Sequence, residues 1–443
     1  MRIGTLCYFL YFQKLPFSLY ESILPWYAMN GIDMGEINHS REFARKFVSS
    51  VYDVLVKRLR VLLSKPLPCT GDVSPIVILG DKGTVKRDVT QPTIIRVAFP
   101  GEQNLFRKYY LSHPLVTSHS GDNVTELLIQ SIKETLNWSI PEIRERFCGG
   151  AFDGQYLKLN VPTHLAEKLS LKPDFTEDST IWDAAHRVEL ACEDTKKGTK
   201  WLTDFDTTLQ SIMKKFTLGM HHTDVRDIAK ELGETFLEFC LFSDTRFIEY
   251  AHRTYDHFYL MYKVLTTKVR RDIEKDPGGE NDRGHTETQM AQLYFVLDLI
   301  FMREISHLMT MFSTSVQTFD VLPFHSMNQF EKLKENLSVA MEKFKLSQFP
   351  DTITLESRGN KKKYSLWSDF SKCIEMIRSD QSFYGFLLLL PNDRGRVLRS
   401  SVTDLVGFDA HIKSRFSMYG KYLEHLLFFL HSRFLPWPGW VVE

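Results

Sequence analysis

Two short apolar stretches that each end in an aspartate constrain the fold of this chain more than any other feature. The first runs from Pro75 to Asp81 and the second from Phe147 to Asp153. Apolar runs of this length predict buried strands, and the glycine after Asp153 allows the chain to turn sharply. We therefore expect both aspartates at strand ends, where open α/β sheets place their sites. The alternative for Asp153 is a turn aspartate that caps the next helix.

The elements predicted between the two stretches place them in one sheet. Strands are predicted at 92–99 and 107–111, and an amphipathic helix at 122–136. This order predicts an α/β sheet in which the two acidic ends are neighbours. Asp81 and Asp153 are 153 − 81 = 72 residues apart in the chain. As hard oxygen ligands they suit two-metal phosphoryl chemistry, and we expect their carboxylates within roughly 4 to 8 Å of each other.

Helical periodicity dominates the rest of the chain. Ser40 is the predicted N-cap of a long amphipathic helix, and apolar residues recur at helical spacing beyond Trp201. We expect a helical segment at 1–70, an α/β core at 71–205 and a helical region at 206–443. The predicted fold is therefore an α/β core within a chain that is helix-rich overall.

Charge and cysteine content exclude several functional classes. Lys plus Arg equals Asp plus Glu at 55 each, so no overall field attracts nucleic acid or an anionic membrane. A local cluster of Lys57, Arg58 and Arg60 could contact phosphates, or be the solvated face of a helix. The 6 cysteines lack the spacing of a zinc site, which predicts reduced thiols in a nuclear or cytoplasmic protein.

Targeting signals are also missing from the sequence. Residues 1–12 are apolar but lack a following small-residue cleavage site, so we do not expect secretion. The apolar runs at 386–391 and 426–430 are far shorter than the ~20 residues of a membrane span. We therefore expect no transmembrane segment and no membrane partner.

An ordered series of motifs resembles those of hAT-superfamily transposase-derived proteins. The series covers most of the chain, from about Leu15 to Trp440, and is closest to an animal group whose members often carry zinc fingers. Its members are Asp81-Lys82-Gly83-Thr84, Gly150-Ala151-Phe152-Asp153-Gly154-Gln155-Tyr156, Val161-Pro162-Thr163-His164-Leu165, Trp182-Asp183-Ala184-Ala185-His186-Arg187, Asp244-Thr245-Arg246-Phe247 and Leu435-Pro436-Trp437-Pro438-Gly439-Trp440.

The resemblance implies a ribonuclease H-like core with a mixed sheet, interrupted by a large all-α insertion. In the family an Asp, Asp, Glu triad holds the catalytic metal ions. Asp81 matches the first acid and Asp153 the second, so both are candidate catalytic residues and ligands of Mg²⁺ or Mn²⁺. No zinc site is predicted.

The resemblance also suggests three nucleic-acid-binding residues. His186 matches the histidine of a Cys/His motif, although Ala184 and Ala185 stand where a cysteine is usual. Arg246 matches the arginine of an Arg-Trp motif, and Phe247 replaces a tryptophan that can stack on an extruded base. The alternatives are that His186 orders the turn after Trp182 and that Arg246 joins the helical layer to the sheet.

The third acid cannot be assigned from the sequence. Glu304, Glu375 and Glu424 lie on helical stretches, and we predict each to be a surface residue. No BED-type zinc finger precedes Asp81, and the family's C-terminal dimerisation segment is expected beyond residue 443, so the chain resembles a truncated member. A His221-His222 pair could bind a metal or simply begin a helix.

Three functional hypotheses follow from these features. The first is a domesticated transposase body that binds nucleic acid or a protein partner without efficient cleavage. The second is an active metal-dependent transposase or nuclease that uses Asp81, Asp153 and an unassigned glutamate. The third is a protein-interaction scaffold without DNA binding, favoured by the zero net charge. The oligomeric state stays open.

Overall fold

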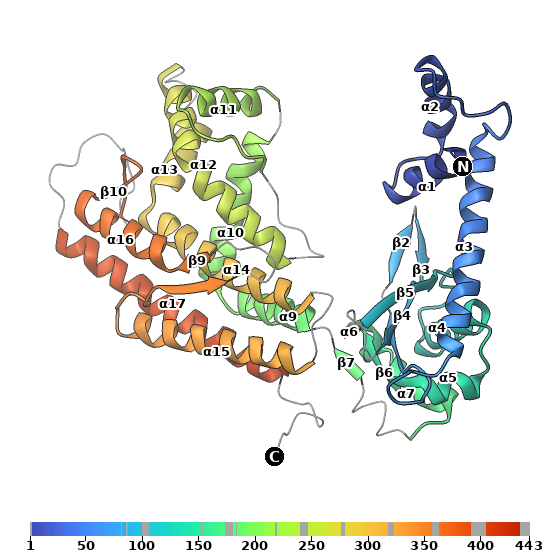
Figure 1. The fold of residues 1–443 in the computed structure, drawn as a ribbon. Helices are drawn as coiled ribbons and strands as arrows, with labels where there is room; N and C mark the ends of the chain where they lie inside the picture. The colour runs from blue at the N-terminus through green and yellow to red at the C-terminus, as the bar shows by residue number, and fades with distance from the viewer. Residues whose placement is uncertain are drawn as a thin grey trace. The chain divides into compact units, whose positions relative to one another are not determined.

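The structure is a computed structural model that divides into two compact units. It describes residues 2–434 except 81, 86, 100–105, 153, 173–179, 183, 218, 240–246, 276–279, 318–322, 357–362 and 391–404. The N-terminal unit spans Met1–Trp182 and the C-terminal unit spans Asp183–Glu443 (Figure 1). Each unit has a hydrophobic core of its own.

Three helices open the N-terminal unit: α1 (Arg2–Phe12), α2 (Ser18–Met29) and α3 (Arg41–Ser64). Helix α3 begins where the sequence predicts, because the Ser40 hydroxyl accepts a hydrogen bond from the backbone N–H of Phe43. Its first half packs with α1 and α2 around a small core, and its second half enters the sheet's core through Leu59 and Leu63. A single helix thus connects two hydrophobic clusters.

The sheet follows α3. Its strands are β1 (Ile76–Gly80), β4 (Thr93–Ala98), β5 (Phe106–Ser112), β6 (Phe147–Phe152) and β7 (Thr180–Trp182). They lie in the order β5-β4-β1-β6-β7. Strand β4 is antiparallel to both β1 and β5, whereas β1, β6 and β7 are parallel. A separate hairpin of β2 (Gly83–Val85) and β3 (Asp88–Thr90) follows β1.

Helices pack on one face of this sheet. After β5 the chain forms α4 (Gly121–Leu136) and α5 (Ile140–Arg146), and after β6 it forms α6 (Gly154–Lys158) and α7 (Val161–Leu169). Alternate side chains of the central strands, such as Ile78 and Ile95, are fully buried and share a core with Leu128 and Ile132 of α4. The sequence predicted the strands and α4 but not α5.

The glycines of β6 make room for an aromatic side chain at the end of the strand. A Cβ atom on Gly150 would lie 2.3 Å from Cε2 of the Phe152 ring. No side chain fits in that space without displacing the ring. The Gly-Gly sequence therefore sets how the strand ends, directly before residue 153.

The C-terminal unit is predominantly helical. Its helices are α9 (Ala184–Lys197), α10 (Lys200–Phe216), α11 (Gly219–Glu231), α12 (Phe247–Lys275), α13 (Glu280–Ala291), α14 (Leu293–Gln317), α15 (Pro323–Lys345), α16 (Ser368–Asp380) and α17 (Leu405–Phe434). Helix α14 is apolar on most of its circumference and is buried along most of its length. Its Phe301 ring stacks on Tyr419 of α17, with the ring centroids 3.9 Å apart.

The coarse fold prediction is confirmed, because the chain is helix-rich and contains a mixed sheet. Among the described residues three hairpins were not predicted, namely β2 with β3, β8 (Ile353–Glu356) with β9 (Lys363–Leu366) and β10 (Ser382–Phe383) with β11 (Phe386–Leu387). The compact units divide after Trp182, while the predicted end of the α/β core at residue 205 falls within α10. Within the described ranges, no helix is both long and apolar enough to cross a bilayer.

Candidate functional site

The ends of strands β1 and β6 are the site that the sequence predicts. The two strands are parallel neighbours, and their last paired residues are Gly80 and Phe152. The next residues in the sequence are Asp81 and Asp153, which lie outside the described residues. The distance between their carboxylates, and their role as metal ligands, therefore stay predictions. The described register places the residues that precede them side by side.

Two buried aromatic rings pack against these strand ends. The Phe152 and Tyr156 rings stack with centroids 5.5 Å apart, and a Cβ on Gly80 would lie 3.1 Å from each ring. The buried Tyr156 hydroxyl donates a hydrogen bond of 2.7 Å to Oε1 of Gln91. Nζ of Lys82 lies 5.9 Å from the centroid of the Tyr156 ring. The backbone at the predicted site is therefore held by close packing and carries a nearby positive charge.

The three predicted nucleic-acid-binding residues belong to the C-terminal unit. His186 lies in the first turn of α9, where its Nδ1 is 3.7 Å from a carboxylate oxygen of Glu189. Arg246 lies outside the described residues. Phe247 is the first residue of α12, but its side chain also lies outside the described residues. Their predicted contact with nucleic acid stays a prediction.

The alternative metal candidates have ordinary helical roles. His221 and His222 begin α11, with the His221 ring against Phe216 and Nε2 of His222 3.0 Å from a carboxylate oxygen of Glu238. No group of three or more potential metal ligands occurs among the residues that the structure describes. Asp81 and Asp153 are not among the described residues, so the Mg²⁺ or Mn²⁺ site stays a prediction.

One of the three candidate third acids differs from its predicted surface position. Glu304 of α14 is only 7% exposed, because α14 is buried along most of its length. Its carboxylate accepts a 3.0 Å hydrogen bond from the backbone N–H of Trp367, which directly precedes α16. Burial raises the pKa of Glu304 to about 7, although this hydrogen bond lowers it. The prediction of a surface glutamate was wrong at this position.

The other two candidates are surface residues as predicted. Glu375 of α16 is exposed. Glu424 of α17 lies 3.1 Å from Nζ of Lys345, and its side chain is 56% exposed. Neither has a described contact that would mark it as a metal ligand.

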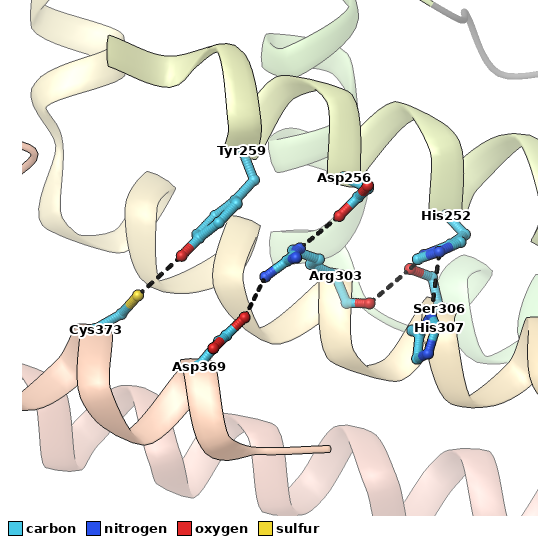
Figure 2. Close-up of polar contacts among 8 residues, drawn as sticks. All are labelled: His252, Asp256, Tyr259, Arg303, Ser306, His307, Asp369 and Cys373. Atoms are coloured by element: carbon cyan, nitrogen blue, oxygen red, sulfur yellow. Dashed lines mark hydrogen bonds and ion pairs between the residues drawn. The ribbon is translucent and has the colours of Figure 1, made fainter. Parts of the chain in front are cut away.

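A polar cluster that the sequence did not predict joins α12, α14 and α16 (Figure 2). We call it the three-helix polar cluster, and its members are His252, Asp256, Tyr259, Arg303, Ser306, His307, Asp369 and Cys373. On α12 and α16 the members are three, four or seven residues apart and share one helical face, and on α14 Ser306 and His307 lie three and four residues after Arg303. This spacing was the only sequence signal for the cluster.

Arg303 is the central residue of the three-helix polar cluster. Its Nε donates a hydrogen bond of 2.7 Å to Oδ1 of Asp256, and its Nη1 donates one of 3.4 Å to Oδ2 of Asp369. Its guanidinium lies 4.1 Å from the centroid of the Tyr259 ring. Burial alone would lower the pKa of Arg303, but the hydrogen bond and charge of Asp256 raise it above its usual value.

Two histidines form the other end of the cluster. Nε2 of His252 lies 3.1 Å from Nδ1 of His307. Burial lowers the pKa of His252 to about 4 and also lowers the pKa of His307, so both rings are neutral at pH 7. The Ser306 hydroxyl donates to the carbonyl of Arg303 at 3.1 Å, which leaves it to accept from Nδ1 of His252 at 3.4 Å.

Perturbed pKa values mark both functional sites and structural ion-pair networks. In this cluster the Arg303 guanidinium contacts the carboxylates of both Asp256 and Asp369, and the Tyr259 hydroxyl lies 3.2 Å from Sγ of Cys373. These contacts link three helices whose cluster residues are far apart in the chain. The geometry therefore supports a structural role for the three-helix polar cluster.

Comparison with known proteins does not assign a family. No protein-family model matches the chain, and no curated protein is detectably similar to it in sequence. Its function must therefore be inferred from its residues and their geometry.

Proposed function

We propose that the N-terminal unit is the ribonuclease H-like core of an hAT transposase-derived protein. The observation that carries this proposal is the strand arrangement β5-β4-β1-β6-β7, with three antiparallel strands followed by two parallel ones. Ribonuclease H-like cores share this arrangement and place acids at the ends of the first and fourth strands. In this chain β1 is the first strand of the sheet and β6 is the fourth. Asp81 directly follows β1, and Asp153 directly follows β6.

In this proposal the protein binds nucleic acid without cleaving it efficiently. Phosphoryl chemistry of this type uses three acids, and two carboxylates alone would hold metal ions weakly. Glu304, a candidate third acid, is buried and already accepts a hydrogen bond from the backbone of Trp367. The carboxylates of Asp81 and Asp153 remain as ligands for Mg²⁺ or Mn²⁺.

The neighbouring positions of β1 and β6 fit a shared metal site. Residues that follow paired positions on parallel strands leave the sheet at the same edge, and carboxylates are the ligands that Mg²⁺ prefers. A bound divalent ion would neutralise phosphate charge and activate water. Asp81 and Asp153 would hold the ion, and Lys82 adds a positive charge near the same strand end.

Two assays on the whole chain test the proposed function. We expect binding to DNA whose affinity falls steeply with salt, because phosphate contacts release counterions. We also expect supercoiled plasmid to stay intact in Mg²⁺ or Mn²⁺. Nicking by the wild type that is lost in Asp153→Asn would instead establish an active nuclease.

A protein-interaction scaffold is the second candidate, and exposed aromatic residues in the first two helices favour it. Tyr11, Phe12 and Trp26 are 59%, 67% and 59% exposed. The Phe12 ring also stacks on Tyr8 with the ring centroids 6.2 Å apart, and large exposed apolar groups that lie close together often mark protein-interaction surfaces. Failure to bind DNA even at low salt would leave this candidate in place of the first.

A further inference from the structure

The two outer antiparallel strands of the sheet carry aromatic and basic side chains on the same face. The register pairs Ile94 with Tyr110, Arg96 with Lys108 and Ala98 with Phe106. Because paired residues point to the same side of a sheet, these side chains share one face. We call Arg96, Phe106, Lys108 and Tyr110 the β4–β5 strip.

The strip lies on the face opposite the hydrophobic core. Ile95 and Val97, which alternate with the strip residues along β4, are fully buried in that core. In contrast, Tyr110 is 52% exposed and Lys108 is also exposed. Arg96 and Phe106 are half-buried, so Tyr110 and Lys108 are the accessible part of the strip, and they lie on a strand rather than on a loop.

The chemistry of the strip suits an anionic partner that has flat rings. The sequences of β4 and β5 are TIIRVA and FRKYYLS, which contain no acidic residue. The Arg96 guanidinium lies 4.1 Å from the centroid of the Phe106 ring, which holds it in position. Basic groups next to exposed aromatic rings can contact phosphates while bases stack on the rings.

The aromatic surface continues beyond the strip. Burial raises the pKa of the Tyr110 hydroxyl, and the hydroxyls of Tyr52 and Tyr11 raise it further. Tyr52 is 44% exposed and Tyr11 is 59% exposed. The Tyr52 hydroxyl also donates a 2.8 Å hydrogen bond to the backbone carbonyl of Leu111 at the sheet edge. This hydrogen bond places the exposed Tyr52 side chain close to the backbone that follows Tyr110.

We propose that the β4–β5 strip binds single-stranded nucleic acid, with bases stacked on Tyr110 and phosphates held by Lys108 and Arg96. This inference rests on the proposed nucleic-acid-binding function and names the surface that performs it. A single strand fits better than a duplex, because exposed rings on a sheet can reach only unpaired bases.

The test measures the affinity of the whole chain for a labelled oligothymidine and for a duplex over a series of salt concentrations. Tyr110→Ala should weaken binding of the single strand on the order of tenfold, the loss expected for one stacked base. Lys108→Gln should reduce the slope of log affinity against log salt by about 0.7, the value for one phosphate contact on a single strand. Both side chains are exposed, so the unfolding midpoints of these variants should match that of the wild type.

Matched substitutions at other exposed sites serve as controls. Tyr250→Ala removes a tyrosine that is 37% exposed in the C-terminal unit, and Lys332→Gln removes an exposed lysine of α15. Neither should change affinity or salt slope.

The possible outcomes separate the strip from the general function. If the combined Tyr110→Ala and Lys108→Gln variant binds the single strand with wild-type affinity, the proposed role of the strip is refuted. The proposed nucleic-acid binding of the chain would still stand. Tighter binding of the duplex than of the single strand would refute the single-strand assignment. If the wild type binds neither probe at low salt, both the strip and the proposed function are wrong.

Discussion

Replacing Glu304 by glutamine should stabilise the C-terminal unit at neutral and alkaline pH. In the folded protein the pKa of this carboxyl is raised by burial from 4.5 to about 7. The difference of 7 − 4.5 = 2.5 corresponds to an upper limit of about 3 kcal/mol for keeping the charge buried. Glutamine keeps an oxygen that can accept the hydrogen bond from Trp367 and removes the charge.

The sign of this effect depends on pH. A carboxyl whose pKa is higher in the folded state favours folding below its unfolded pKa, and this contribution is lost as the pH rises through the folded pKa. The stability of the wild type should therefore fall between about pH 4.5 and pH 7 by the contribution of Glu304. In Glu304→Gln this part of the pH dependence should disappear.

Urea unfolding at several pH values measures the effect. We expect Glu304→Gln to match the wild type near pH 4.5 and to be more stable by roughly 1 to 3 kcal/mol at pH 8. Glu375→Gln, which changes an exposed glutamate on α16, is the matched control and should have little effect at either pH. Lower stability of Glu304→Gln at pH 8, or an unchanged pH dependence, would refute the reasoning.

Three further substitutions test the packing, each by urea unfolding. Arg415→Met should lower the free energy of unfolding by about 3 to 5 kcal/mol, because it leaves the buried Asp298 carboxylate without its guanidinium partner. An unchanged free energy of unfolding would contradict this. Gly150→Ala should lower the free energy of unfolding by about 1 to 3 kcal/mol, because the new Cβ would lie 2.3 Å from the Phe152 ring. Stability equal to that of the wild type would show that the ring moves aside freely. Ser40→Ala should lower the free energy of unfolding by about 1 kcal/mol, and Ser40→Asp should lower it much less because aspartate can also cap the helix. Equal losses in the two variants would argue against the cap.

Local features of the fold could be predicted from the sequence. The cap at Ser40, the strands before residues 81 and 153 and the helix α4 all depend on residues that are close in the chain. The long amphipathic helix predicted after Ser40 is α3, but it is not buried along its whole length. Leu55 is 53% exposed, because it lies between the parts of α3 that pack against two separate cores.

Contacts between distant helices could not be predicted in the same way. Arg303 and Asp369 are 66 residues apart, and Tyr259 and Cys373 are 114 residues apart. Glu304 was predicted to be exposed because glutamate on a helix is usually solvated, and its hydrogen bond to a residue 63 positions away has no sequence signal. Likewise, the β4–β5 strip became recognisable only from the register that aligns two strands.

Binding of Mn²⁺ measured by electron paramagnetic resonance tests the paired-acid site most directly. We predict weak binding by the wild type that is lost equally in Asp81→Asn and in Asp153→Asn, because both carboxylates hold the same ion. Glu304→Gln should bind Mn²⁺ as the wild type does, because its buried carboxylate contacts the backbone of Trp367. Binding that survives Asp153→Asn, or that is lost in Glu304→Gln, would contradict the proposed ribonuclease H-like site.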